Sequence, residues 1–392
     1  LIAVLDSGFD GIGHVAFDSL SVAYTRDFVD GDDEPYGHDH GTEVLSVMAA
    51  LDHGLMIGAA PYADYVLART EIVENIPNES DYRIEEDNWV AAIEWVDSLG
   101  VDVVNSSLGY NIFEGGDGYT WDDLDGNTAI TTIAADIAVS KGIVVVTSAG
   151  NEGNDDWYYI TTPADGFDVL AVGSVDVTLN LSSFSSRGPT ADGRIKPDFV
   201  ALGSSVSVVN TGETEGYNYL QGTSYASPSL AGAAALLLEI HPEWSPGDLR
   251  DALRETSIDL GEAGADSLYG WGLADAFAAS GLEEPEEPDV VRFRSEPPYP
   301  QPLNFTEGDT AIYFPVEVPD AGTVSLRIFT FTGLNVKTVE TVYPESGKYE
   351  NRSETVNWDG TNFTGDEVAP GIYFYTIKFA NVTHTGKIAV IR

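Results

Sequence analysis

Four short segments of the sequence each place a side chain that could take part in catalysis beside a glycine. They supply a carboxylate, an imidazole, an amide and a hydroxyl, at Asp6, His40, Asn151 and Ser224. Glycine neighbours let the backbone approach a ligand closely. Taken singly, each segment has an ordinary explanation as a turn, a cap or an exposed loop residue. Taken together, the four groups are those that acyl transfer requires.

The four side chains predict a division of roles. Ser224 would attack a carbonyl carbon, His40 would take its proton, and Asp6 would hold the imidazole tautomer and stabilise its cation. The Asn151 amide and the backbone N–H of Ser224, at the expected start of a helix, would donate hydrogen bonds to the oxyanion. This chemistry requires no cofactor.

Elements that could position these groups are visible in residues 1–282. Short β-branched runs such as Val101–Val104 and Ile143–Val146 alternate with helical patterns at Asp87–Gly100 and Ala129–Ser140. This order predicts an α/β fold with a mostly parallel sheet and helices on both faces. Ligands bind at the carboxyl ends of such strands, which is where the four segments should meet.

The rest of the chain has a different character. Residues 283–296 open with repeated Glu and Pro, which predicts an extended acidic linker. Residues 297–392 show period-two runs separated by turn residues, which predicts a small all-β sandwich.

Composition limits the partners that the chain can have. It holds 64 acidic and 18 basic residues among 392, a formal net charge of −46, most of it in the first 282 residues. Such a field disfavours nucleic acid and anionic membranes. There is no cysteine, and no apolar run is long enough for a membrane span. We expect a monomer, and an upstream signal or pro-segment before Leu1.

The flanking residues resemble those of subtilisin-like serine proteases, the subtilase family, which has the same order of Asp, His, Asn and Ser. This resemblance implies a secreted bacterial serine endopeptidase that acts on polypeptides. The matching text stands at Ile2–Gly8, His40–Thr42, Val144–Gly153, Ala171–Val175, Ser182–Pro189 and Gly222–Pro228. Two positions depart from the family, which commonly has His where this chain has Glu43 and Ser229.

The resemblance also assigns a substrate-binding cleft. One wall is the strand that would pair with an extended substrate, Ser107, Leu108, Gly109 and Tyr110, and the other wall is Ser148, Ala149 and Gly150. Neither wall carries a charge, which predicts a P1 preference for large apolar or aromatic residues. A basic P1 preference would need a carboxylate from elsewhere, Glu152 or Asp165. Tyr110 stands where the family usually has Gly, which predicts a rim that is narrower or aromatic.

Subtilases often bind structural calcium, and hard cations bind clustered oxygens. Two acidic loops are candidates, which solvated surface loops would also explain. They contain Asp30, Asp32 and Asp33, and Asp122, Asp123 and Asp125. His38 and His40 with a carboxylate are a weaker candidate for zinc.

Two further interpretations stay open. Residues Pro297–Arg392 resemble the Ig-like sorting domain that directs many Bacteroidetes proteins to type IX secretion, through Trp358–Gly360, Val368–Tyr375 and Gly386–Arg392. A stabilising or adhesive accessory domain is the alternative. For the first domain, the rival to an enzyme is a catalytically silent subtilase scaffold that acts in binding.

Overall fold

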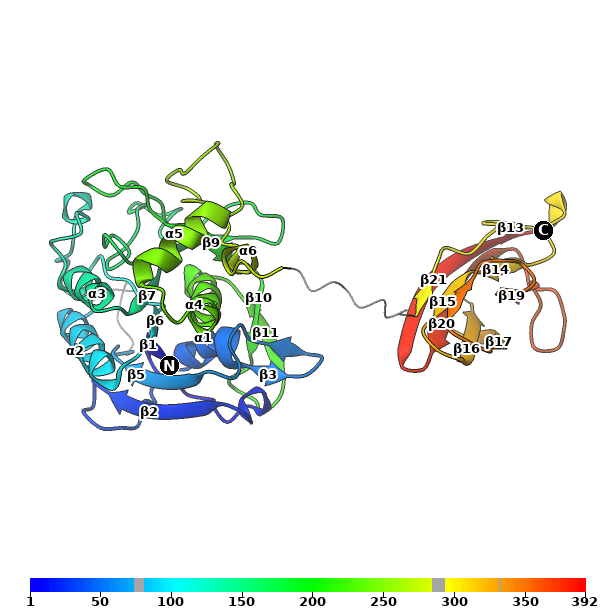
Figure 1. Ribbon diagram of the computed structural model, residues 1–392, viewed down its shortest axis with the longest axis horizontal. Helices are drawn as coiled ribbons and strands as arrows, with labels where there is room; N and C mark the ends of the chain where they lie inside the picture. The colour runs from blue at the N-terminus through cyan, green and yellow to red at the C-terminus, as the bar shows by residue number, and fades with distance from the viewer. Residues whose placement is uncertain (74–80, 284–292, 331–332) are drawn as a thin grey trace. The chain divides into compact units, whose positions relative to one another are not determined.

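The computed structural model describes residues 1–73, 81–283, 293–330 and 333–392. The chain divides into two compact units, Leu1–Leu282 and Glu283–Arg392 (Figure 1). Within the described ranges, no helix is long and apolar enough to cross a membrane.

A seven-stranded sheet forms the centre of the first unit, in the order β2-β5-β1-β6-β7-β8-β9, and every pairing in it is parallel. The central strands are buried at every residue because Val, Ile, Leu and Ala occupy both of their faces. The predicted fold class is confirmed. The strands are β1 (Ile2–Asp6), β2 (Ser21–Asp27), β5 (Asp64–Arg69), β6 (Val103–Ser106), β7 (Val144–Ser148), β8 (Leu170–Val175) and β9 (Phe199–Leu202).

Helices cover both faces of this sheet (Figure 1). Buried residues of α1 and α4 pack with one face, and those of α2 and α3 pack with the other. The helices are α1 (His40–Ala49), α2 (Arg83–Leu99), α3 (Ile130–Ser140), α4 (Thr223–Ile240), α5 (Pro246–Thr256) and α6 (Ala276–Ala279). Two hairpins lie outside the sheet, β3 (Leu51–Asp52) with β4 (Met56–Ile57) and β10 (Val206–Val209) with β11 (Tyr217–Leu220).

Helix α2 begins four residues before the predicted start. Glu85, on its first turn, accepts a hydrogen bond from the backbone N–H of Tyr82 at 2.6 Å, which caps the helix. Gly100 ends the helix in the left-handed conformation, with φ of 75°, as its position in the pattern predicted.

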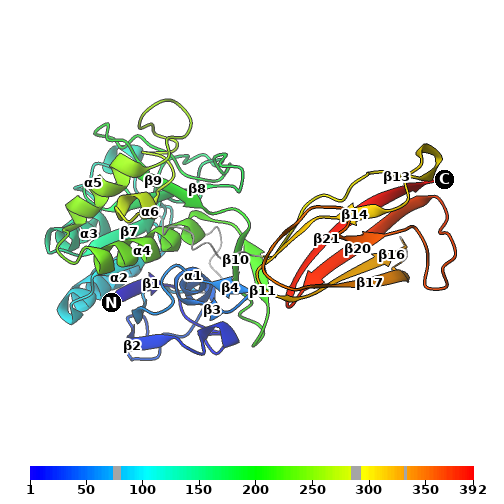
Figure 2. The same cartoon turned by 45° about the vertical axis from the view of Figure 1, so that its right-hand side comes forward.

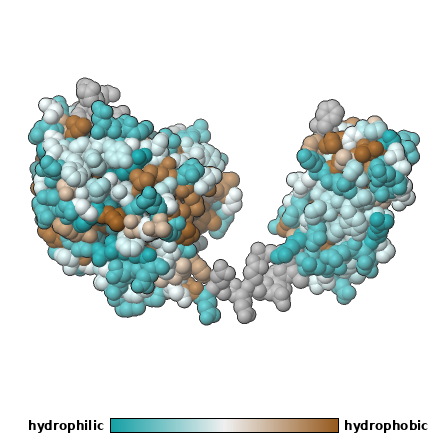
Figure 3. Space-filling view, turned by 90° about the horizontal axis from the view of Figure 1, so that it is seen from above, coloured by the Kyte–Doolittle hydropathy of each residue, from teal (hydrophilic) through white to brown (hydrophobic). Residues whose placement is uncertain are grey.

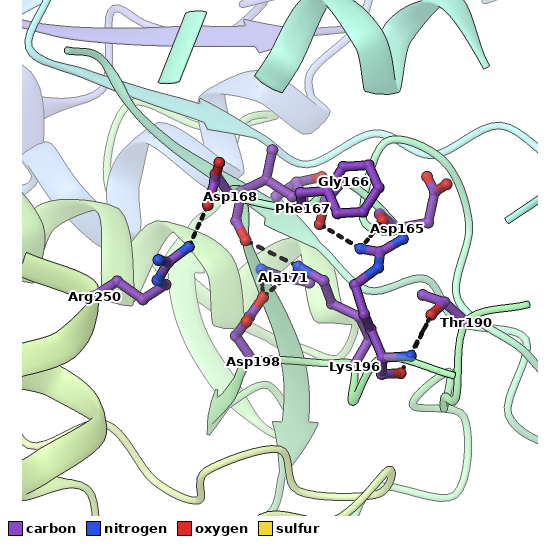
Figure 4. A network of polar contacts seen from close by, with 12 residues as sticks. Asp165, Gly166, Phe167, Asp168, Ala171, Thr190, Lys196, Asp198 and Arg250 are labelled. Atoms are coloured by element: carbon purple, nitrogen blue, oxygen red, sulfur yellow. Dashed lines mark hydrogen bonds and ion pairs between the residues drawn. The ribbon is translucent and has the colours of Figure 1, made fainter. Parts of the chain in front are cut away.

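A buried ionic network joins the sheet to α5 (Figure 4). The Lys196 ammonium, only 2% exposed, donates to Asp198 Oδ2 at 2.6 Å and to the Val169 carbonyl at 3.0 Å. The same Asp198 oxygen accepts the Ala171 N–H at 3.0 Å, and Arg254 of α5 reaches the other oxygen at 3.4 Å. Because buried charges cost much unless they are paired, these contacts hold the loop before β9 in place.

The second unit is built mostly from antiparallel strands around its own apolar core, although β13 and β21 pair in parallel (Figure 2). Its largest sheet has the order β13-β21-β20-β16-β17. A smaller sheet has the order β12-β15-β18, and another pairs β14 with β19. The strands are β12 (Arg294–Ser295), β13 (Leu303–Asn304), β14 (Ile312–Phe314), β15 (Val316–Val318), β16 (Gly322–Phe329), β17 (Asn335–Tyr343), β18 (Gly347–Tyr349), β19 (Val356–Trp358), β20 (Gly371–Phe379) and β21 (Val382–Ile391).

The predicted linker of residues 283–296 extends too far. Residues 284–292 lie outside the described part of the chain, but β12 pairs with β15 and so belongs to the second unit. Phe293 is 5% exposed and stacks on Phe379, with ring centroids 5.6 Å apart. Burial of its large aromatic ring stabilises Phe293 in the core of the second unit. The charged residues around Phe293 in the sequence instead suggest a solvated linker.

The visible surface in Figure 3 is mostly hydrophilic, with apolar residues gathered in a few patches. This agrees with the strong excess of acidic residues in the sequence.

Candidate active site

The four predicted side chains lie at one edge of the sheet of the first unit. Asp6 is the last residue of β1, and Asn151 follows the end of β7. His40 begins α1 and Ser224 lies in the first turn of α4, and both helices pack with the same face of the sheet. Parallel strands end at the same edge, so the fold brings these residues together.

Asp6 fixes the orientation of His40. The distance between His40 Nδ1 and Asp6 Oδ1 is 2.7 Å, and the Asp6 side chain is fully buried. The backbone N–H of Ser7 donates to the same carboxylate oxygen at 2.8 Å. An ionised carboxylate only accepts hydrogen bonds, so Nδ1 carries the proton and the Nε2 lone pair is left to act as a base.

The close approach of α1 to β1 depends on Gly41. A Cβ atom at this position would lie 2.4 Å from the Gly8 carbonyl oxygen and 2.9 Å from Asp6 Cβ. Any other residue at position 41 would therefore push the helix away and lengthen the bond between His40 and Asp6.

The surroundings of His40 favour its charged form. Burial lowers the pKa of the imidazole, but the Asp6 carboxylate, through its charge and its hydrogen bond, more than reverses this, and Glu43 and Asp39 add to the effect. The net result is a raised pKa. The side chain keeps 25% exposure, which leaves it open toward solvent.

Ser224 is held at the start of α4 by contacts with the end of β6. Its hydroxyl donates to the Ser107 carbonyl at 3.2 Å, and the Ser107 hydroxyl donates to the Ser224 carbonyl at 2.8 Å. Within the described chain, the Ser224 hydroxyl is not hydrogen-bonded to His40. Rotation about its Cα–Cβ bond is what would redirect the oxygen.

Asn151 is oriented by the turn that precedes α4. Its Oδ1 accepts hydrogen bonds from the Thr223 N–H at 2.9 Å and from the Thr223 hydroxyl at 3.0 Å. The same hydroxyl accepts the Gly150 N–H at 3.2 Å. With its oxygen bound in this way, the amide has its N–H groups available as donors beside the residue that precedes Ser224.

The two predicted walls of the cleft lie beside each other. Ser106 of β6 pairs with Thr147 of β7, so the ends of these two strands are neighbours. Beyond them, Ser148 Oγ lies 3.5 Å from the Leu108 carbonyl oxygen. Gly109 is required where it stands, since a Cβ there would lie 2.1 Å from Thr161 Oγ1.

The predicted aromatic rim at Tyr110 is wrong. The Tyr110 side chain is 1% exposed, stacks on Phe113 and donates its hydroxyl to Glu71 at 2.8 Å. Its backbone forms an antiparallel bridge with Thr162. A large side chain gains more from burial in the core than from exposure at a rim, so it turns inward.

Tyr110 also leads to a cluster of carboxyl groups that the sequence did not reveal, because only the fold brings their side chains together. Burial, with repulsion from Glu85, raises the pKa of Glu71 well above its ordinary value. Burial and the charges of Glu85, Glu86 and Glu152 raise the pKa of Asp81 to about 8. These carboxyl groups therefore keep their protons to higher pH than usual, because burial disfavours their charged form.

Of the two carboxylates named as alternatives for the pocket, Asp165 is committed elsewhere. It is fully buried and accepts the Thr132 hydroxyl at 2.6 Å and the Gly126 N–H at 2.9 Å. Glu152 follows Asn151, and its backbone N–H donates to Ser186 at 2.9 Å.

Neither acidic loop gathers its side chains into a cluster of metal ligands. Across the described residues, no group of three or more His, Cys, Asp or Glu side chains could hold a metal ion, and this includes the groups around His38 and His40. The loop carboxylates have local partners instead, which is why they do not converge. Asp30 forms an ion pair with Arg69. Asp32 and Asp125 accept N–H groups within their own turns, and Asp123 accepts the N–H of Thr120. Asp33 and Asp122 lie in the same two loops.

Comparison with known proteins identifies the first unit. The model of the subtilase family matches residues 1–272. Subtilisin of Bacillus pumilus is 36% identical over 288 residues, which cover 71% of this chain and 90% of that protein. Subtilisin E of Bacillus subtilis is also 36% identical, over 71% of this chain but only 65% of that protein.

Solved structures agree on the fold. MycP1 from the ESX-1 type VII secretion system superposes with a TM-score of 0.56 at 23% identity, over 75% of this chain and 83% of that one. The prenylagaramide maturation protease PagA gives a TM-score of 0.54 at 21% identity, over 72% and 92%. The chain belongs to the subtilase family, and its first unit is of the subtilisin-like serine endopeptidase class.

Proposed function

We propose that this chain is a secreted serine endopeptidase that hydrolyses peptide bonds through Asp6, His40 and Ser224, with Asn151 in the oxyanion hole. The bond of 2.7 Å between His40 Nδ1 and the buried Asp6 carboxylate carries the proposal. It leaves Nε2 as the basic atom, on the first residue of a helix that packs beside the helix of Ser224.

The proposed reaction has two halves. Ser224 Oγ attacks the scissile carbonyl carbon while its proton passes to His40 Nε2, and the carbonyl oxygen becomes an oxyanion. Collapse of this intermediate expels the amine, which takes the proton from His40, and leaves an acyl ester on Ser224. Water then attacks the ester with the same base, and the acid product and the free hydroxyl are released.

The oxyanion donors are the Asn151 side-chain amide and the Ser224 backbone N–H. The bonds from Thr223 to Asn151 Oδ1 support this role, because they fix the amide before the charge forms. Preorganised donors cost no reorganisation at the moment of reaction, which is why they are effective.

For substrates, we propose polypeptides bound in extended form along Ser107–Tyr110, with a large apolar or aromatic residue at P1. The walls offer apolar surface and backbone, and burial of an apolar side chain gains about 25 cal/mol per Å². Burial of an unpaired carboxylate against such walls is costly, so acidic P1 residues should be the poorest.

A serine-directed fluorophosphonate tests the proposed function. The wild-type protein should be labelled at Ser224, and the Ser224→Ala variant should not be labelled while its unfolding midpoint stays close to that of the wild type. Absence of labelling in a folded wild-type protein would favour the catalytically silent scaffold.

For the second unit, we propose an Ig-like export module recognised by type IX secretion machinery, which would make the protein extracellular. Its mostly antiparallel strands around a separate core support an independent domain. Deletion of residues 297–392 in a host with this system should retain the protein inside the cell. Unchanged export would leave the accessory-domain alternative.

A further inference from the structure

Glu43 and Tyr225 join the helix that carries His40 to the helix that carries Ser224. The Tyr225 hydroxyl donates to Glu43 Oε2 at 2.8 Å. Glu43 lies one turn after His40 on α1, and Tyr225 directly follows Ser224 on α4. Tyr225 is 6% exposed, so this hydrogen bond is largely protected from water.

The ring of Tyr225 also contacts the imidazole. The ring centroids of Tyr225 and His40 are 5.8 Å apart, with the planes inclined at 53°. Asp6 holds His40 at Nδ1, so the imidazole has a hydrogen bond from β1 and a packing partner from α4. Its position relative to Ser224 therefore depends on both elements.

Charge links the same residues. Burial lowers the pKa of His40, whereas the charges of Asp6, Glu43 and Asp39 raise it. Burial raises the pKa of Glu43, an effect that the hydrogen bond from Tyr225 and the charges of His40 and His38 oppose. The titratable groups that face His40 and Glu43 are thus Asp6 from β1, Tyr225 from α4, and His38 and Asp39, which precede His40 in the chain.

We propose that Glu43 and Tyr225 form a positioning pair for His40. Tyr225 holds the Glu43 carboxylate where its charge stabilises the imidazolium that forms when Ser224 loses its proton. The inference rests on the proposed function, since it requires His40 to be the base. Neither residue is proposed to touch the reacting atoms, so both act through His40.

The pair is testable through the pH dependence of kcat/KM on a peptide p-nitroanilide. In Glu43→Gln, the amide oxygen can still accept from Tyr225, but the charge is gone. We expect the acid limb to move to lower pH by roughly half a unit to one unit, because a neighbouring anion favours the charged imidazole. The kcat on the high-pH plateau should fall about 3- to 10-fold with KM within twofold.

Tyr225→Phe keeps the ring but releases the carboxylate, so it should shift the acid limb in the same direction by a smaller amount. If Tyr225 acts through Glu43, the double variant should behave like Glu43→Gln alone. Tyr217→Phe is the matched control. It removes another bond from a tyrosine to a carboxylate, the 2.5 Å contact with Asp52 outside the site, and should leave the limb unchanged.

Several results would overturn the proposal. An acid limb that stays in place in Glu43→Gln, or a loss of activity that is equal at every pH, would mean that the pair only supports the fold. Additive effects in the double variant would separate Tyr225 from Glu43. If Glu43→Gln does not fold, the test uses Glu43→Asp, which keeps the charge. Its acid limb must then lie close to the pH of the wild-type limb. Failure of the wild-type protein to react with the fluorophosphonate would reject the proposed function instead.

Discussion

Replacement of Asn151 by alanine separates two roles of this side chain. The amide nitrogen is the proposed oxyanion donor, whereas Oδ1 accepts from the Thr223 N–H at 2.9 Å and the Thr223 hydroxyl at 3.0 Å. Loss of one oxyanion donor typically lowers kcat by about 10²–10³, which is ~2.7–4 kcal/mol of transition-state stabilisation. We expect this loss in kcat with KM nearly unchanged, because the bond strengthens only in the transition state.

The effect on stability should be much smaller. Asn151 is exposed, so water can replace its oxygen as acceptor for Thr223, and the free energy of unfolding should change by ~1 kcal/mol or less. Unfolding is best measured in a Ser224→Ala background, where the protein cannot digest itself. A large change in stability would mean that the kinetic loss comes from a damaged site.

Thr223→Ala is the matched control. It removes one donor to Asn151 Oδ1 and the acceptor for the Gly150 N–H, but it keeps the backbone bond and the amide N–H groups. One neutral hydrogen bond contributes about 0.5–1.5 kcal/mol, so kcat should fall less than about tenfold. If both variants lose the same activity, or if Asn151→Ala raises KM with normal kcat, the assignment of Asn151 to the oxyanion hole is refuted.

Three further predictions concern His40, Lys196 and the P1 preference. The raised pKa of His40 should place the acid limb of kcat/KM above pH 6.5, because the free enzyme needs His40 as a neutral base. An acid limb below pH 6.5 in a pH–rate profile would contradict this prediction. Lys196→Met should lower the free energy of unfolding by about 3–5 kcal/mol and Tm by roughly 6–15 °C, because Asp198 loses its buried partner. The measurement is a thermal melt in the Ser224→Ala background. A change under 1 kcal/mol would show that Arg254 alone suffices to compensate the Asp198 charge. In a proteome-derived cleavage profile, Leu, Met, Phe or Tyr at P1 should exceed Asp and Glu by at least about tenfold in kcat/KM, ~1.4 kcal/mol, and dominance of Lys or Arg at high salt would reject the apolar pocket.

The fold class of the first unit was predictable because two periodicities dominate its sequence. The buried strands, such as β7, are short runs rich in β-branched residues, and α2 carries apolar residues at helical spacing up to Gly100. The nature of the chemistry was predictable too, since Asp6, His40 and Ser224 stand at element ends beside glycine.

What the sequence concealed depends on side-chain direction and on pairs far apart in the chain. Tyr110 follows a strand, and only packing determines that its ring turns inward to Phe113 and its hydroxyl to Glu71. The contact of Glu43 with Tyr225 joins residues 182 positions apart, and no periodicity predicts such a pair. For the acidic loops, composition alone does not distinguish carboxylates that converge from those that bind their own turns.

The tight contact at Gly41 has a consequence for how an enzyme of this kind can lose activity. The separation of α1 from β1 is set by backbone atoms in van der Waals contact, with no room for a methyl group. A hydrogen bond of 2.7 Å ceases to be one after a displacement of less than 1 Å. Gly41→Ala should therefore disable the chemistry while Asp6, His40, Asn151 and Ser224 all remain. A relative with an intact triad and no glycine at this position would be an inactive protein that a search for catalytic residues alone would count as a protease.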